Sequence, residues 1–64
     1  MLEPETTFGA WLRYRRRLLD MTQTELAQRA MLSRRQVSRL ERGLCRMRGT
    51  TRHRLIWTLH HHID

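Results

Sequence analysis

Two helix-start signatures, eleven residues apart, constrain the fold of this chain more than any other feature. Thr22-x-x-Glu25 and Ser33-x-x-Gln36 both fit the capping box, in which a hydroxyl group and the side chain three residues later each accept a hydrogen bond from a free backbone amide. Apolar residues flank each box at the spacing of a hydrophobic staple, as Met21 with Leu26 and Leu32 with Val37. The pattern predicts a helix over residues 23–30, a tight turn through residues 31–32, and a second helix that begins after Ser33.

The second helix, over about residues 34–42, is amphipathic. When its residues are projected at 100° each, cationic and polar side chains fall within an arc of about 140°, and apolar side chains lie opposite. The cationic arc comprises Arg34, Arg35, Ser38, Arg39 and Arg42, and the apolar arc, which is expected to pack, comprises Val37, Leu40 and Leu44. Glu41 projects beside the apolar arc, where a carboxylate needs a cationic partner, and the first helix can supply one. Residues 22–42 are therefore predicted to form a helix-turn-helix unit.

The N-terminal part of the chain is predicted to form an arm and one long helix. Residues 1–6 are acidic and contain the only proline, so we expect a flexible arm that leads into a cap at Thr6 or Thr7. The helix then runs to about Leu19, and Asp20 marks its exit turn. Its apolar stripe comprises Phe8, Leu12 and Leu19, joined by Trp11 and Leu18.

The C-terminal part is predicted to form a last helix. Gly43 is expected to end the preceding helix in a left-handed conformation, and residues 44–49 form a loop. Thr50 or Thr51 then caps a helix whose apolar residues are Leu55, Ile56, Leu59 and Ile63. Trp57 is expected to fill the core or an interface. Because no strand pattern appears, the chain is predicted to be an all-α domain over residues 7–64, either a compact four-helix domain or a five-helix domain cut short.

The charge of the chain indicates a polyanionic partner. The net charge of +7 arises from thirteen basic residues, all of them arginine, against six acidic residues. Arginine forms bidentate hydrogen bonds to phosphate and to guanine, so the bias suits double-stranded DNA, although a GC-rich coding sequence would produce it without selection for binding.

Size and cysteine content exclude other classes. A chain of 64 residues buries only about 60% of the surface that its unfolded form exposes, so a large catalytic cleft is not expected. The lone Cys45 cannot form an internal disulfide and fits a reducing compartment. No apolar run reaches the length of a membrane span, and the start MLEPETT is not a secretory signal. These features predict a cytoplasmic protein with no membrane partner.

The histidines do not predict a metal site. His53, His60, His61 and His62 could bind a metal with Cys45 by residue type, but the chain has neither a Cys-x-x-Cys pair nor the histidine spacing of a zinc finger. They fit a polar helix end or an appended tag. The acidic residues are scattered and no glycine-rich phosphate loop is present, so we predict no metal, no cofactor, no small-molecule ligand and no enzymatic activity.

Residues 8–60 resemble the Cro/C1-type helix-turn-helix family, the lambda-repressor-like or XRE domains of bacterial and phage regulators. The residues that carry the resemblance are Phe8-Gly9, Leu12-Arg13, Arg16, Thr22-Gln23, Leu26-Ala27, Ser33, Val37-Ser38, Glu41 and Gly43. The resemblance implies that Gln23 contacts a phosphate and that Arg16 pairs with Glu41. It also implies base reading by Arg34, Arg35, Gln36 and Arg39. Met31 stands where the family usually has glycine, so this turn must either avoid or tolerate a left-handed backbone.

The sequence as a whole predicts a sequence-specific DNA-binding transcriptional regulator, expected to be a repressor, that reads the major groove with residues 34–42. The arginines are expected to read guanine, and Gln36 is expected to read adenine. Phosphate contacts are expected from Gln23, Ser38, Arg42, Arg13, Arg17, Arg46 and Arg48. We expect a homodimer, at least on DNA. Two alternatives stay open: an antitoxin-like or accessory protein-interaction module that docks through Trp57 and Ile63, and the N-terminal DNA-binding segment of a larger regulator.

Overall fold

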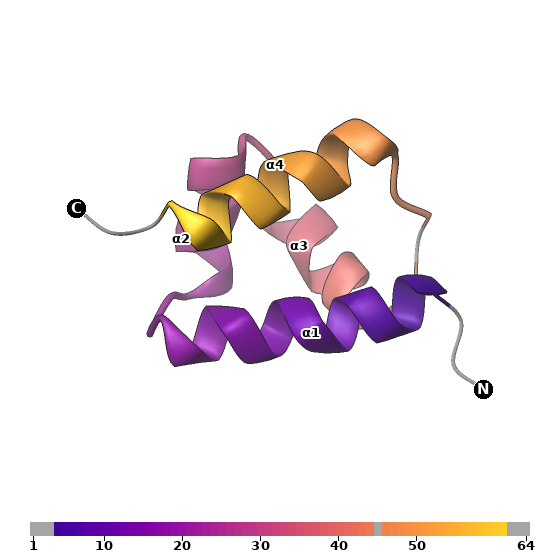
Figure 1. Ribbon diagram of the computed structural model, residues 1–64, viewed down its shortest axis with the longest axis horizontal. Coiled ribbons are helices and arrows are strands. Elements are labelled where there is room, and N and C mark those ends of the chain that lie inside the picture. Colours follow the sequence, from indigo (N-terminus) through magenta and orange to yellow (C-terminus); the bar gives the residue numbers. More distant parts are fainter. Residues whose placement is uncertain (1–3, 45, 62–64) are drawn as a thin grey trace.

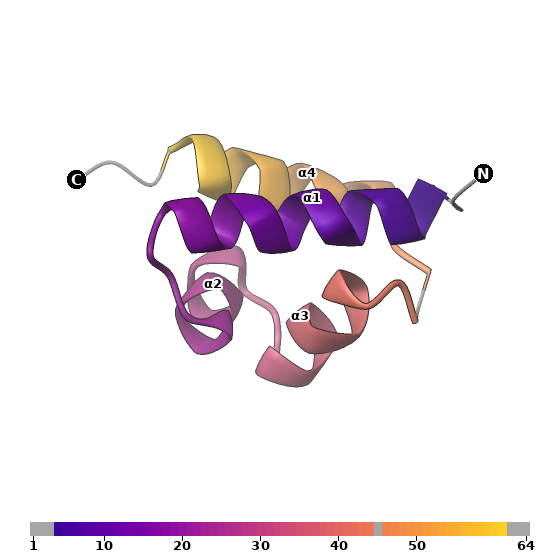
Figure 2. The same ribbon diagram turned by 90° about the horizontal axis from the view of Figure 1, so that it is seen from below.

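The computed structural model describes residues 4–44 and 46–61, with side chains from residue 7 onward. Over this part of the chain it has four helices and no strand: α1 (Pro4–Leu18), α2 (Gln23–Ala30), α3 (Arg34–Glu41) and α4 (Gly49–His60). In Figure 1, α1 and α4 lie along the long axis of the molecule. Figure 2 shows that they form one layer and that α2 and α3 form the other. The predicted all-α architecture is confirmed.

The first helix begins earlier than the sequence predicts. It starts at Pro4 rather than after a cap at Thr6 or Thr7, so residues 4–6 are helical instead of belonging to an arm. Proline suits the first helical position because its fixed φ matches the helix and its missing N–H would have no partner there. Residues 1–3 of the predicted arm lie outside the described residues. At the other end, Asp20 adopts a left-handed conformation with a φ of 57° and forms the predicted exit turn.

Helix α2 has the predicted bounds and ends in a turn that tolerates a left-handed methionine. Met31 has a φ of 60° and a ψ of 43°. The Leu32 amide donates to the Ala27 carbonyl at 2.8 Å, and the Met31 amide donates to the Gln28 carbonyl at 3.3 Å, which is the Schellman pattern. The side chain of Met31 is 77% exposed, so the strain of this backbone is not offset by packing.

Helix α3 ends at Glu41, and Gly43 takes the predicted left-handed conformation with a φ of 68°. The Gly43 amide donates to the Leu40 carbonyl at 3.1 Å, and the Leu44 amide donates to the Arg39 carbonyl at 2.9 Å. The prediction that Leu44 packs with the apolar arc was wrong, because its side chain is 56% exposed. The left-handed turn at Gly43 carries the chain off the helix axis before Leu44, so a helical projection no longer applies to that residue.

The start of α4 also differs from the prediction. The helix begins at Gly49, with Arg48 in the cap position, and no side chain caps it. Thr50 and Thr51 therefore lie inside the first turn rather than before it. The first turn of α4 also contacts α1, since the Arg52 guanidinium lies over the Phe8 ring, 4.9 Å from its centroid. Ile63, predicted for the same helix, lies outside the described residues.

The core is built from all four helices. Its largest fully buried side chains are Leu12, Leu26, Val37, Leu55 and Leu59. Leu18, predicted to extend the apolar stripe of α1, is instead 57% exposed, and Trp57, at 55% exposed, does not fill the core. Leu18 lies about 100° around the helix from Leu19 and is too short to reach the core from there. Trp11 is similarly displaced, but its larger ring packs against Phe8 with centroids 5.3 Å apart.

Helix α1 crosses the end of α3 at backbone distance. A β-carbon added to Gly9 would overlap the Leu40 carbonyl oxygen and would lie 2.9 Å from the Glu41 carbonyl oxygen. Only glycine allows this approach, and the approach brings α1 side chains within reach of the end of α3. No helix in the described part of the chain combines the length and the apolar character needed to cross a bilayer.

Candidate nucleic-acid interface

The capping box of α3 fixes where this helix begins, and with it the position of its arginine face, which comprises Arg34, Arg35 and Arg39. The Ser33 hydroxyl accepts a hydrogen bond from the Gln36 amide at 3.1 Å, and the Gln36 side-chain oxygen accepts one from the Ser33 amide at 3.0 Å. Behind the helix, Val37 and Leu40 are buried in the core. Because the buried side is fixed, the opposite side of α3 must face solvent.

Arg34, Arg35 and Arg39 lie together on this exposed side of α3. Among the described residues, none of their side chains forms a hydrogen bond or an ion pair. Figure 2 places the first turn of α3 on the side of the molecule farthest from α1 and α4. The three guanidinium groups are therefore available to an external ligand.

The expected pair of Arg16 and Glu41 is present and joins α1 to α3. Arg16 Nε donates to Glu41 Oε2 at 2.6 Å, and Arg16 Nη2 donates to Glu41 Oε1 at 3.1 Å. The Glu41 side chain is 2% exposed and the Arg16 side chain 12%. The remaining guanidinium nitrogen, Nη1, donates to the Met21 carbonyl oxygen at 2.8 Å. A buried carboxylate is thus neutralised by a bidentate partner.

Gln23, predicted to contact a phosphate, also belongs to this network. Its Nε2 donates to Glu41 Oε1 at 3.1 Å, which links the first residue of α2 to the last residue of α3. A carboxamide nitrogen carries two hydrogens, so one N–H of Gln23 is left for another acceptor. No local pattern indicates this contact, because 18 residues separate the two side chains.

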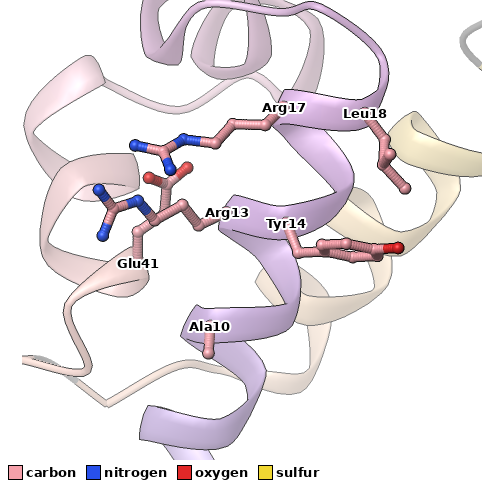
Figure 3. Close-up of a pocket in the computed structure, with 6 residues that line it drawn as sticks. All are labelled: Ala10, Arg13, Tyr14, Arg17, Leu18 and Glu41. Carbon is pink, nitrogen blue, oxygen red and sulfur yellow. The ribbon is translucent and has the colours of Figure 1, made fainter.

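Five of the residues predicted to contact phosphate line one cavity of about 210 Å³ beside Glu41. They are Arg13, Arg17, Gln23, Ser38 and Arg42, and Arg16 and Glu41 complete the lining. Since Arg16 balances Glu41, the cavity keeps the positive charge of three arginines. A broader cavity of about 550 Å³ on α1 shares Arg13, Arg17 and Glu41. Figure 3 shows Arg13 and Arg17 extending from α1 toward Glu41, while Tyr14 and Leu18 point to the other side.

Arg46 and Arg48 lie apart from this group. They line a cavity of about 150 Å³ with Gln36, Leu40, Met47 and Thr51, at the loop that follows α3. The predicted phosphate contacts therefore divide into two cationic clusters, one beside the end of α3 and one beside its capping box. The predicted base-reading residues Arg34, Arg35 and Arg39 line neither cavity.

The described histidines do not form a metal-binding cluster. No group of three histidine, cysteine or acidic side chains within residues 7–44 and 46–61 is placed to hold a metal. His61 stacks on Trp57 with ring centroids 4.3 Å apart, and its Nδ1 lies 2.9 Å from the Trp57 carbonyl oxygen. Cys45 and His62 lie outside the described residues.

Besides the Gln23–Glu41 hydrogen bond, sequence reasoning missed two contacts between helices. The close approach at Gly9 has a signal in the sequence, since glycine inside a helix is unfavourable and indicates a packing reason. The cation–π contact between Arg52 and Phe8 has none, because it depends on how α4 lies beside α1.

Comparison with known proteins agrees with the geometry of this site. A helix-turn-helix family model matches residues 12–51, more than half of the chain, from the second half of α1 into the first turn of α4. Searches of curated proteins and of solved structures found no match. The matched segment contains both capping boxes, the Arg16–Glu41 pair and the arginine face of α3. The chain belongs to the Cro/C1-type, or XRE, helix-turn-helix family, whose domains are DNA-binding modules of transcriptional regulators.

Proposed function

We propose that this protein is a sequence-specific transcriptional repressor that inserts α3 into the major groove of operator DNA. The observation that carries the proposal is the exposed, uncompensated guanidinium face of Arg34, Arg35 and Arg39, supported from behind by buried apolar side chains. Arginine forks match guanine O6 and N7 in the major groove, so G-rich half-sites are expected. Repression follows from occupancy, because a bound domain blocks access of other proteins to the same DNA.

The two cationic clusters are proposed to hold the DNA backbone on either side of α3. Arg13, Arg17 and Arg42 line one cavity together with Gln23, and Arg46 and Arg48 line the other. Contacts of this kind set the position of a protein on the duplex without choosing a sequence. We also propose that two copies bind together, with half-sites about 34 Å apart, the separation of one DNA turn.

Selection from a randomised duplex library tests the proposal. The wild-type chain should enrich a motif with guanines in each half-site, arranged as an inverted repeat. The double variant Arg35→Ala and Arg39→Ala should lose the motif while its circular dichroism stays helical. A control with the same charge change, Arg29→Ala and Arg54→Ala, removes exposed arginines from α2 and α4 and should keep the motif. Equal binding to all duplexes by the wild type would defeat the proposal.

A specific observation also favours the protein-interaction alternative as a second function. Met31 and Trp57, both largely exposed, line a cavity of about 230 Å³ between the end of α2 and α4. Its other lining residues include Arg29, His53 and Arg54 and no acidic residue. This chemistry suits an acidic peptide with an apolar anchor. Peptide display should enrich such sequences on the wild-type protein and not on the Trp57→Ser variant. The same variant should bind DNA as the wild type does.

A further inference from the structure

The side-chain oxygen of Gln36 is fully used inside the protein. It accepts from the Ser33 amide at 3.0 Å, and the Ser33 hydroxyl lies 3.3 Å from the same oxygen. That hydroxyl in turn accepts from the Gln36 amide at 3.1 Å. A carbonyl oxygen has two lone pairs, and both have partners here.

This arrangement also fixes which end of the carboxamide is which. A backbone N–H can only donate, so the atom facing the Ser33 amide must be the oxygen, and the NH₂ group must be the free end. Gln36 is an exposed residue at the third position of α3, one helical turn before the buried Leu40. In this conformation Gln36 offers a ligand two hydrogen-bond donors and no acceptor.

The capping box of α2 provides an internal comparison. There the same role is filled by Glu25, whose carboxylate accepts from the Thr22 amide at 2.9 Å. Glutamate caps at least as well as glutamine, because its charge is stabilised at a helix N-terminus. Cap stability therefore does not explain glutamine in α3. A carboxylate at position 36 would, however, place an acceptor and a negative charge on the arginine face.

We infer that Gln36 and the three arginines on the exposed side of α3 present donors only, and that Gln36 selects bases whose major-groove edges carry acceptors and no amino group. The inference rests on the proposed function and specifies its recognition rule. Arg34, Arg35 and Arg39 likewise have no acceptor, and no carboxylate shares this face in the described part of α3. Guanine, with O6 and N7, fits two donors best, and thymine O4 fits one. Adenine and cytosine each present an amino group that would face another donor.

The inference opposes the expectation that Gln36 reads adenine. Bidentate pairing with adenine requires the glutamine oxygen to accept from the adenine amino group. That oxygen would first have to leave both Ser33 groups and leave the Ser33 amide without a partner. The capping box and adenine recognition therefore compete for the same atom.

Selection from random duplexes with Gln36→Glu tests the rule. Glutamate keeps the capping box, as Glu25 does in α2, and turns the outward group from donor to acceptor. At one base pair in each half-site, preference should shift from guanine or thymine to cytosine or adenine by at least about fivefold, the lower end for a base-edge contact. Preferences are compared within each library, so a uniform loss of affinity from the added charge does not affect the result.

Two further variants make the test independent of that charge. Gln36→Met removes the donors and the side-chain half of the capping box, and it should abolish the preference at the same base pair. Glu25→Gln is the matched control, because it makes the reverse exchange in the other capping box, and it should leave every base preference unchanged. Thermal unfolding of each variant establishes that it is folded at the temperature of selection.

The outcomes separate this inference from the proposed function. A wild-type motif in which one guanine or thymine responds to both Gln36 variants supports the inference. A wild-type motif with adenine at the responding position overturns it, as does a motif that neither variant changes, and both results leave the proposed function intact. Absence of any wild-type motif overturns the proposed function, and the inference with it.

Discussion

Gly9 of α1 lies directly against the carbonyl oxygen of Leu40 at the end of α3, with no room for a β-carbon between them. This contact sets the distance between the two helices at a point one residue from Glu41. The Arg16–Glu41 ion pair lies about two turns farther along α1. One steric contact and one electrostatic contact thus join α1 to the end of α3, in addition to the packing of the core, and both can be tested by substitution.

Gly9→Ala should destabilise the fold by about 1–3 kcal/mol, the cost of overpacking, because backbone atoms cannot move away as a flexible side chain could. Gly49→Ala is the matched control. An added β-carbon at Gly49 meets nothing within 4 Å, so alanine should be neutral or stabilise by up to about 1 kcal/mol. Urea unfolding monitored by circular dichroism measures both. Equal effects of the two substitutions would contradict the close approach.

Met31→Gly should stabilise the domain by up to about 1 kcal/mol. The left-handed backbone costs a non-glycine residue about 1–2 kcal/mol, and the greater freedom of glycine in the unfolded chain offsets part of that gain. Gly43→Ala tests the same effect in reverse, since Gly43 has a φ of 68° and the domain should be about 1 kcal/mol less stable after substitution. The midpoint of thermal unfolding should rise for Met31→Gly and fall for Gly43→Ala. A Met31→Gly variant less stable than the wild type would refute the left-handed turn.

Glu41→Gln should cost about 3 kcal/mol of folding free energy. The substitution leaves the nearly buried Arg16 guanidinium without its counter-charge, and partial water access to Arg16 places the cost at the lower end for a broken buried pair. Arg16→Met should cost a similar amount of folding free energy, because the buried Glu41 carboxylate would keep only the neutral Gln23 side chain as a donor. Combining the two in a double-mutant cycle should show strong coupling between them. Additive losses would mean that the two side chains act independently.

Arg13→Ala and Arg17→Ala should each reduce the salt dependence of DNA binding without changing the preferred sequence. Removing one phosphate contact should lower the slope of log affinity against log salt by about 0.9. Fluorescence anisotropy over a range of salt concentrations measures the slope. Arg54→Ala removes the same charge from α4, away from this cavity, and should leave the slope unchanged. An altered motif in either α1 variant would assign that arginine to base reading instead.

Local patterns predicted the helix-turn-helix unit because its signals act over a few residues. Both capping boxes, the bounds of α2 and the left-handed Gly43 follow from residue types at fixed short spacings. The predictions failed where tertiary geometry decides the outcome. A projection placed Leu44 in the core although the chain leaves the helix at Gly43, and it placed Leu18 in the apolar stripe although more than half of its surface is exposed. The threonine caps of α1 and α4 were wrong because both helices begin before those residues, at Pro4 and at Gly49.

The hydrogen bond from Gln23 to Glu41 restricts how the protein would meet a duplex. It joins the start of α2, proposed to hold a phosphate, to the end of α3, proposed to lie in the groove, and so couples the positions of these two elements. A duplex must then match the fixed separation between them, and binding to sequences that resist the required groove width would cost deformation energy. Stiffness of uncontacted base pairs should therefore contribute to selectivity beside the direct reading of bases.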